Sequence, residues 1–182
     1  LHEIAGHSLL SYAVSAATEV GPEEVVVVVG HQRDQVQAHL AEIAPHVRIA
    51  VQGDEAYGTG YAVKCGLAAL DDLAQLPPEI MVTYGDVPML TSDTLLDLLA
   101  EHRAQRASVT VLTATIADPT GYGRIVRDAD GHVAKIVEHR DADDATRTIA
   151  EINSGIYVFD SAILAAGLGQ LDTDNVQGEL YL

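Results

Sequence analysis

The sequence has 182 residues, is 48% apolar and carries a formal net charge of −17, from 10 lysines and arginines against 27 aspartates and glutamates. So acidic a surface is poorly suited to nucleic acid or to an anionic membrane, and the longest apolar run is far too short to cross a bilayer. The apolar content is enough for one sizeable core, so we expect a single domain over residues 1–182. The lone Cys65 excludes an internal disulfide framework and is compatible with a reducing compartment.

The first half of the chain alternates helical and strand patterns. In chain order we expect a helix from residue 8 to near 20, a strand at 25–29, a helix at 34–44, a strand at 47–52, a helix at 60–70, a strand at 80–84 and a helix from about 91 to 106. Five consecutive valines at 25–29 are typical of a strand covered on both faces, as in a parallel sheet. In the helix at 34–44, Val36, Leu40 and Ile43 are expected to face inward.

Asp86 follows the apolar run Ile80–Tyr84 and Gly85, and Val87-Pro88 then requires an extended exit. A helix pattern begins soon after, with Thr91 or Ser92 as its N-cap. This places one carboxylate at the carboxyl end of a strand, where open α/β sheets bind their ligands. The simpler alternative is that Asp86 only caps a turn.

A glycine-rich segment, residues 52–60, joins a strand to a helix and contains Gly58-Thr59-Gly60. Such a turn can bring backbone N–H groups and a helix N-terminus close to a ligand. The spacing departs from the dinucleotide fingerprint, and the glycines could simply allow helix and strand to pack. The amide of Gln52 suits the edge of a pyrimidine base, but it could equally be a solvated loop side chain.

The second half of the chain has a different pattern. The expected elements are a strand at 108–116, a loop at 118–124, a β-hairpin with arms at 124–127 and 132–138, a mobile loop or short helix at 140–147, a strand at 152–159, a helix capped by Asp160 and the start of a further element at 177–182. Three βα repeats precede the strand at 108–116, so we predict an α/β fold with a Rossmann-like, mostly parallel sheet, flanking helices and an inserted hairpin.

Taken together, these motifs resemble one known family. They are Gln52 with Gly58-Thr59-Gly60, Tyr84-Gly85-Asp86-Val87-Pro88, the run 118–125, Val137-Glu138-His139, Ile152-Asn153-Ser154-Gly155 and the run 177–182. In order and spacing the chain resembles the uridyltransferase domain of the bacterial bifunctional N-acetylglucosamine-1-phosphate uridyltransferase/glucosamine-1-phosphate acetyltransferases. The resemblance covers essentially the whole chain and implies a fold of the nucleotide-diphospho-sugar transferase type.

The resemblance also has gaps. Compared with the family pattern, we expect the domain to be truncated at both ends, without the N-terminal glycine-rich loop and its lysine, the downstream asparagine that joins the aspartate on the metal, and the C-terminal β-helix that carries acetyltransferase activity and forms a homotrimer. Tyr61 stands where the family usually has histidine, which puts one local contact in doubt.

The resemblance implies that UTP and N-acetylglucosamine 1-phosphate give UDP-N-acetylglucosamine and diphosphate, in the cytoplasm, for peptidoglycan and lipopolysaccharide synthesis. It implies Mg²⁺ as the cofactor, held by Asp86, which is both the catalytic and the metal-binding residue. The implied substrate contacts are Gln52, Gly58 and Thr59 for uracil, Tyr84 and Gly85 for the nucleotide, Gly123, Glu138 and Asn153 for the sugar, and Tyr181 for the acetyl group.

Each of these residues also has an ordinary structural explanation, as a turn former, a solvated charge or a core aromatic, and without the resemblance we would prefer that explanation for every one except Asp86. Lys64 and Arg124 lie close to motif loops, but lone basic residues are more often surface charges, so we leave both out of the site. Two other functions stay open: a nucleotidyltransferase for another sugar 1-phosphate, and a non-catalytic nucleotide-binding module. A flavodoxin-like response regulator is the weakest alternative, because the start of the chain lacks a cluster of acidic residues.

Overall fold

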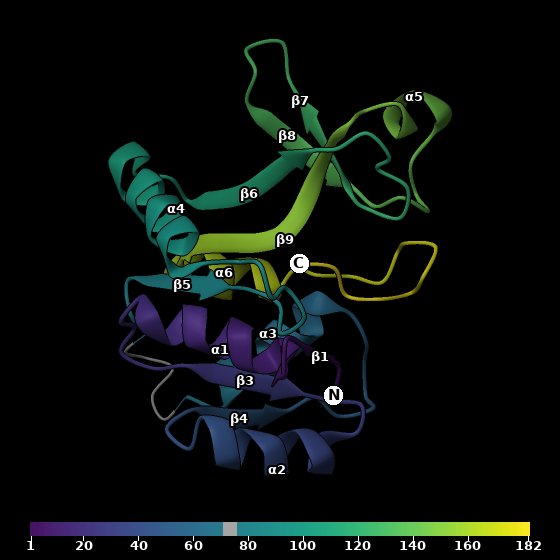
Figure 1. The fold of residues 1–182 in the computed structure, drawn as a ribbon. Helices are drawn as coiled ribbons and strands as arrows, with labels where there is room; N and C mark the ends of the chain where they lie inside the picture. The colour runs from purple at the N-terminus through teal and green to yellow at the C-terminus, as the bar shows by residue number, and fades with distance from the viewer. Residues whose placement is uncertain (71–75) are drawn as a thin grey trace.

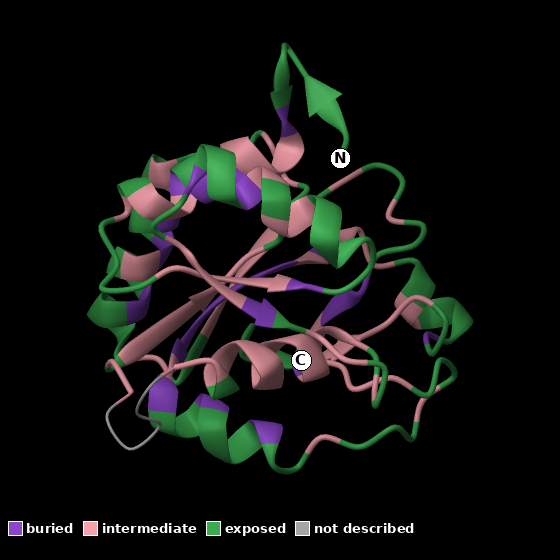
Figure 2. Ribbon diagram, turned by 90° about the horizontal axis from the view of Figure 1, so that it is seen from below, coloured by how far each residue is buried: buried purple, intermediate pink, exposed green. Residues whose placement is uncertain are grey.

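The computed structural model describes residues 1–70 and 76–182. Strands lie in the middle of the molecule and helices cover both of their faces, which gives three layers (Figure 1). Viewed from below, the buried residues gather on the strands and on the inner sides of the helices (Figure 2). The layered α/β fold predicted from the sequence is confirmed.

The helices are α1 (Leu9–Glu19), α2 (Arg33–Ile43), α3 (Thr59–Ala68), α4 (Ser92–Gln105), α5 (Asp144–Arg147) and α6 (Ser161–Leu168). The strands are β1 (Glu3–Ile4), β2 (His7–Ser8), β3 (Val26–Val29), β4 (Arg48–Val51), β5 (Glu79–Val82), β6 (Val109–Thr115), β7 (Arg124–Arg127), β8 (Val133–Val137) and β9 (Glu151–Asp160). The elements predicted between residues 8 and 168 are therefore present, within a few residues of their expected ends, but the further element expected at 177–182 is not. The run 177–182 contains no helix or strand.

The sheet is mixed, and the expectation of a mostly parallel sheet is corrected. β3 and β4 pair in parallel, but β9 pairs antiparallel with β5, β6 and β7, and β7 pairs antiparallel with β8. β9 lies between β5 and β6 and is reached through the β7–β8 hairpin rather than through a crossover helix. Its direction is therefore opposite to that of its neighbours.

Within residues 1–70 and 76–182, β3–β4 and the five-stranded sheet are separate, and two helices pack against both. On one side α1 places Val14 against the β3–β4 core and Ala16 against the core formed with α4 and β9. On the other side Val63 of α3 packs into the third core, which contains Phe159 of β9, and Gly66 approaches Val28. The two sheets are thus held in one layer by shared helices.

Capping and turn chemistry explain where several elements begin. The Thr91 side chain accepts a hydrogen bond from the Thr94 backbone at the start of α4, and Asp160 accepts two at the start of α6. In the hairpin turn, Asp128 Oδ1 accepts hydrogen bonds from the backbone of Asp130 and His132. These caps and the hairpin turn agree with the sequence prediction.

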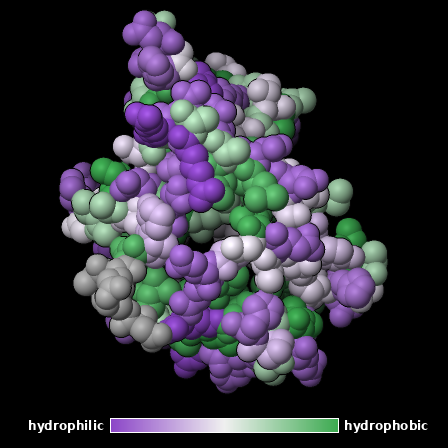
Figure 3. Space-filling view, turned by 90° about the vertical axis from the view of Figure 1, so that its left-hand side faces the viewer, coloured by the Kyte–Doolittle hydropathy of each residue, from purple (hydrophilic) through white to green (hydrophobic). Residues whose placement is uncertain are grey.

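Burial differs from the sequence pattern at two places. Ile43, expected to face inward, is 37% exposed, whereas Leu40 of the same helix is fully buried. Ile43 is the last residue of α2 and lines a cavity between α1 and α2, so it is not fully covered. In β3 only Val29 is fully buried, so the valine run is partly rather than completely covered. Hydrophilic side chains cover much of the face in Figure 3, and apolar ones show in its middle.

The N-terminal β1–β2 hairpin projects from the molecule and is largely exposed (Figure 2). None of the helices described in residues 1–70 and 76–182 has the length and apolar character needed to cross a membrane.

Candidate functional site

Asp86 lies four residues beyond the end of β5, in the connection to α4, and is exposed. Its carboxylate has no hydrogen-bond or ion-pair partner among the described residues. A free carboxylate at a strand's carboxyl end is a suitable ligand for a hard cation such as Mg²⁺, which commonly takes only one or two carboxylates from a protein. The donor set therefore fits the predicted metal role.

Tyr84, two residues before Asp86, lies against β9. A β-carbon built on Gly155 would lie 2.6 Å from the Tyr84 Oη, so only glycine leaves room for the ring. Gly155 has a φ of +76° and belongs to an irregular stretch of β9, between the residues that pair with Val111 and Thr113 of β6. Bulges of this kind are common beside binding sites, because they redirect a strand.

The three residues predicted to hold the sugar meet at one place. The Asn153 backbone N–H donates to the Gly123 carbonyl oxygen at 2.8 Å. A β-carbon built on Gly123 would lie 2.7 Å from Glu138 Oε1, so the carboxylate lies close above the glycine. These residues come from β9, the start of β7 and the end of β8, so the hairpin insertion brings all three together.

The Asn153 amide is already engaged within the protein. Its Nδ2 donates to Tyr157 Oη at 2.7 Å, and its Oδ1 accepts from the Gly155 backbone at 2.9 Å. One N–H and one lone pair of the amide are left for a ligand. The same side chain thus holds the glycine against which Tyr84 packs.

Titratable groups around Glu138 influence one another. Burial and the charge of Asp141 raise the pKa of Glu138, and the positive charge of Arg124 opposes this rise. Burial, then the charges of Glu138 and Asp86, raise the pKa of Tyr84. Burial also raises the pKa of Tyr157 to about 12. Glu138, Tyr84 and Asp86 therefore act within one electrostatic neighbourhood.

Arg124 is the residue that the sequence interpretation missed. We expected a surface charge, but its side chain is 1% exposed. It begins β7, where Ile152 of β9 and Val137 of β8 flank it. No local signal marks it as buried, because the strands that cover it, β8 and β9, follow later in the chain.

Gln52 lines a cavity at the carboxyl ends of β3 and β4. The cavity has a volume of about 900 Å³ and is lined by Gly30, His31, Gln32, Arg33, Asp34, Gln35, Gln52, Gly53, Asp54 and Tyr57. Its size suits a nucleoside, and most of its lining residues are polar or charged. Open α/β sheets bind ligands at this edge.

The predicted turn Gly58-Thr59 is paired with the end of the chain. The Leu180 backbone N–H donates to the Tyr57 carbonyl oxygen at 2.9 Å, and the Leu180 carbonyl oxygen accepts from Gly60 at 2.8 Å. Thr59 Oγ1 accepts from the Leu182 backbone at 3.1 Å. Tyr181 lies within this segment, and the charges of Asp141 and Glu138 help to raise its pKa, after burial. The segment therefore connects the glycine turn to the neighbourhood of Glu138.

Tyr61, in place of the usual histidine, binds within its own loop. Its Oη donates to Glu55 Oε2 at 2.8 Å. This hydrogen bond raises the pKa of Tyr61 to about 12 and lowers the pKa of Glu55. The contact ties α3 to the loop beside the large cavity.

Three buried side-chain polar atoms among the described residues lack a hydrogen-bond partner: Thr83 Oγ1, Arg124 Nε and Tyr181 Oη. Thr83 precedes Tyr84 in the sequence. The charge of Arg124 affects the pKa of Glu138, and the charge of Glu138 affects the pKa of Tyr181. Unsatisfied buried polar atoms are uncommon in proteins, so each of these atoms favours a ligand or ordered water as its partner.

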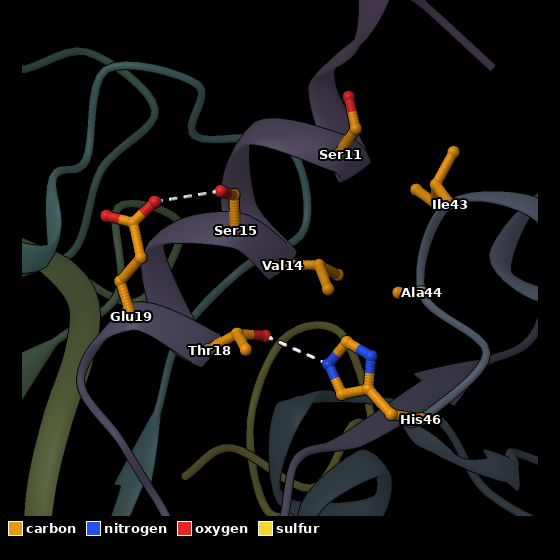
Figure 4. Close-up of a pocket in the computed structure, with 8 residues that line it drawn as sticks. All are labelled: Ser11, Val14, Ser15, Thr18, Glu19, Ile43, Ala44 and His46. Atoms are coloured by element: carbon orange, nitrogen blue, oxygen red, sulfur yellow. Dashed lines mark hydrogen bonds between the residues drawn. The ribbon is translucent and has the colours of Figure 1, made fainter.

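Two other features lie away from this place. A cavity of about 190 Å³ lies between the end of α1 and the end of α2, where Thr18 Oγ1 and His46 Nε2 are 3.3 Å apart (Figure 4). Both helices end there, so this cavity is at the amino ends of the strands. Asp128, Asp130 and His132 could offer ligands within 4.8 Å of one another, but all three are exposed and form the hairpin turn.

The fold and the site define an open α/β protein with a cavity at the carboxyl ends of β3 and β4 and with residues that converge from β9 and from the two sides of the β7–β8 hairpin. The chain belongs to the nucleotidyl transferase family, whose model matches residues 1–179. It is 58% identical over 182 residues to the Bifunctional protein GlmU of Cutibacterium acnes, and 52% identical over 183 residues to that of Streptomyces coelicolor. All of the chain is covered, but only 42% and 37% of these relatives, so the chain spans about two fifths of their length.

Solved structures share the fold. UDP-glucose pyrophosphorylase complexed with UDP-glucose matches with a TM-score of 0.74 and 16% identity, over 99% of this chain and 74% of that one. HddC from Yersinia pseudotuberculosis complexed with GMP-PN matches with a TM-score of 0.63 and 18% identity, over 98% of this chain and 71% of that one.

Proposed function

We propose that this chain transfers the uridylyl group of UTP to N-acetylglucosamine 1-phosphate, giving UDP-N-acetylglucosamine and diphosphate. The observation that carries the proposal is that Gly123, Glu138 and Asn153 lie together beside Tyr84. Asp86 is two residues after Tyr84 in the sequence. Membership of the nucleotidyl transferase family supports the type of reaction. The ordered motifs that match the uridyltransferase family support the choice of substrates.

In the proposed reaction, a phosphate oxygen of the sugar 1-phosphate attacks the α-phosphorus of UTP. The bond from that phosphorus to the bridging oxygen of the β-phosphate breaks, and diphosphate leaves with the bonding electrons. No covalent enzyme intermediate is needed, so the protein contributes positioning and charge neutralisation. Asp86 would hold a divalent cation, for which we propose Mg²⁺, and the cation would neutralise phosphate charge.

The other residues would bind and orient the substrates. Gln52, at the large cavity, would contact uracil, and the turn Gly58-Thr59 would lie beside the base. Ionised Glu138 would accept hydrogen bonds from sugar hydroxyls, and the free N–H and lone pair of Asn153 would face the N-acetyl group. Tyr84 with Gly85 would line the nucleotide, and Tyr181 would adjoin the acetyl end.

We further propose that residues 1–182 form one nucleotidyltransferase domain of a longer, bifunctional protein. In that protein an acetyltransferase domain would follow and would assemble three copies. The product would supply peptidoglycan and lipopolysaccharide synthesis in the cytoplasm.

The test is diphosphate release by the full-length protein with UTP, Mg²⁺ and a panel of sugar 1-phosphates. We expect the highest kcat/KM with N-acetylglucosamine 1-phosphate. If glucose 1-phosphate is converted faster, glucose 1-phosphate replaces N-acetylglucosamine 1-phosphate as the proposed substrate. Calorimetric binding of UTP without turnover of any sugar would instead support a non-catalytic nucleotide-binding module.

A further inference from the structure

Arg124 is a charged side chain buried where three strands meet. It is 1% exposed and lies opposite Val137 of β8 and Ile152 of β9. A guanidinium stays charged at any physiological pH. Burying it is costly unless hydrogen bonds and nearby negative charge compensate, so its position requires an explanation.

The guanidinium makes two hydrogen-bond contacts, one from each of its terminal nitrogens, and its Nε is left without a partner. Nη1 donates to the backbone carbonyl oxygen of Tyr122, and Nη2 lies 3.3 Å from His139 Nδ1. Because Nη2 can only donate, Nδ1 acts as the acceptor in this contact. Nε is buried without a partner, and Arg124 makes no ion pair within the part of the chain that the structure describes.

These two contacts flank two residues of the proposed sugar site. Tyr122 immediately precedes Gly123, and His139 immediately follows Glu138. The Glu138 carboxylate lies so close to the Gly123 α-carbon that a β-carbon there would be 2.7 Å from Oε1. Arg124 therefore joins the segment that carries the glycine to the segment that carries the carboxylate.

We propose that Arg124 is a positioning residue of the sugar 1-phosphate site, which sets the separation of Gly123 and Glu138 by tying Tyr122 to His139. The inference rests on the proposed function, because it concerns the same site. A purely structural arginine would stabilise the whole domain, so its loss would weaken the binding of UTP and of the sugar 1-phosphate to a similar extent. A positioning arginine affects the sugar phosphate selectively.

The experiment compares Arg124→Met and Arg124→Lys with the wild-type full-length enzyme. We expect Arg124→Met to raise the KM for the sugar 1-phosphate roughly ten- to a hundredfold, as for loss of a charged hydrogen-bonding group, and to change the KM for UTP by no more than about twofold. Arg124→Lys keeps the charge and one contact, so it should recover part of the loss. The matched control is Arg127→Met, on the same strand but exposed and paired with Glu151, which should leave both KM values within about twofold.

Equal changes in the two KM values, or no change in either, would overturn the inference. If Arg124→Met does not fold, His139→Leu removes one of the two contacts and keeps the arginine, and it must still raise the KM for the sugar more than that for UTP. The comparison uses whichever sugar 1-phosphate the wild type converts fastest. Wild-type turnover therefore decides the proposed function, and the ratio between variants decides the role of Arg124.

Discussion

The phenol ring of Tyr84 lies against the α-carbon of Gly155, with its Oη and Cζ each 2.6 Å from the place that a β-carbon at 155 would occupy. This contact joins the connection after β5 to the middle of β9. It brings the segment that contains Asp86 next to the segment that contains Asn153.

We therefore expect Gly155→Ala to damage both stability and activity. A left-handed φ costs a non-glycine residue about 1–2 kcal/mol, and the added methyl also displaces Tyr84. The free energy of unfolding should fall by at least that amount, and kcat/KM should fall with it. Gly167→Ala is the control, because this glycine is exposed in α6 with no atom within 4 Å, and it should keep or slightly raise stability. Equal behaviour of the two variants would contradict the Tyr84 contact.

Asp86→Asn should largely abolish Mg²⁺-dependent diphosphate release, because a neutral amide oxygen binds Mg²⁺ more weakly than an ionised carboxylate. The measurement is kcat against Mg²⁺ concentration in the full-length protein. Asp97→Asn, an exposed change on α4, should leave the rate unchanged. Activity of Asp86→Asn within a few-fold of wild type at saturating Mg²⁺ would remove Asp86 from the metal role.

The sugar preference should depend on Asn153. A substrate without the acetamide leaves a buried polar group unpaired, which costs about 1–3 kcal/mol, or roughly ten- to a hundredfold in kcat/KM. N-acetylglucosamine 1-phosphate should exceed glucose 1-phosphate and glucosamine 1-phosphate by that margin, and Asn153→Ala should narrow it. Tyr157→Phe removes only the internal partner of the amide and should keep the preference. Comparable kcat/KM for the three sugars in the wild type would reject the assignment.

The raised pKa of Glu138 predicts a pH dependence of sugar binding. Ionised Glu138 accepts hydrogen bonds, so binding of UDP-N-acetylglucosamine should weaken as pH falls, beginning above the ordinary pKa of glutamic acid. The sign for stability is opposite: a carboxyl that holds its proton more tightly when folded contributes stability at low pH, which is lost as pH rises through its folded pKa. Calorimetric titration between pH 4 and 7 measures the binding, and a flat profile would exclude Glu138 from the contact. Glu138→Gln should remove the dependence.

The 182-residue polypeptide by itself should be prone to aggregate. Within the described residues, β3 has β4 as its one paired neighbour and β5 has β9, so each of these strands has an open edge. Unpaired strand edges are templates for association. Light scattering and thermal unfolding provide the test, and a polypeptide that stays monomeric and melts cooperatively would refute the prediction.

Local chemistry made much of the fold predictable. The caps at Thr91 and Asp160 and the hairpin turn at Asp128 use side chains that bind their own neighbouring backbone, so sequence alone identifies them. Strand direction was not predictable in this way. β9 is a strand by pattern, but its antiparallel place between β5 and β6 depends on contacts distant in sequence.

The same distinction applies to the site. Asp86 could be proposed because a strand end is a local feature, and its metal role stays a prediction. The burial of Arg124 could not be predicted in this way, because it results from β8 and β9 closing over a residue that looks like a surface charge. The contact of Leu180 with Gly60 could not be predicted either, because it joins residues that are 120 positions apart in the sequence.

The pairing of Leu180 with Tyr57 and Gly60 has a consequence for engineering and for divergence of the family. The hairpin that carries Gly123 and Glu138 is contiguous in sequence, so it could be expected to change the sugar specificity when it is exchanged between enzymes. The segment around Tyr181, however, is hydrogen-bonded to the glycine turn and lies close enough to Glu138 for that carboxylate to add to the rise that burial causes in the pKa of Tyr181. A graft of residues 118–155 alone from another sugar nucleotidyltransferase would meet a mismatched partner in residues 178–182, so the two stretches should be transferred together.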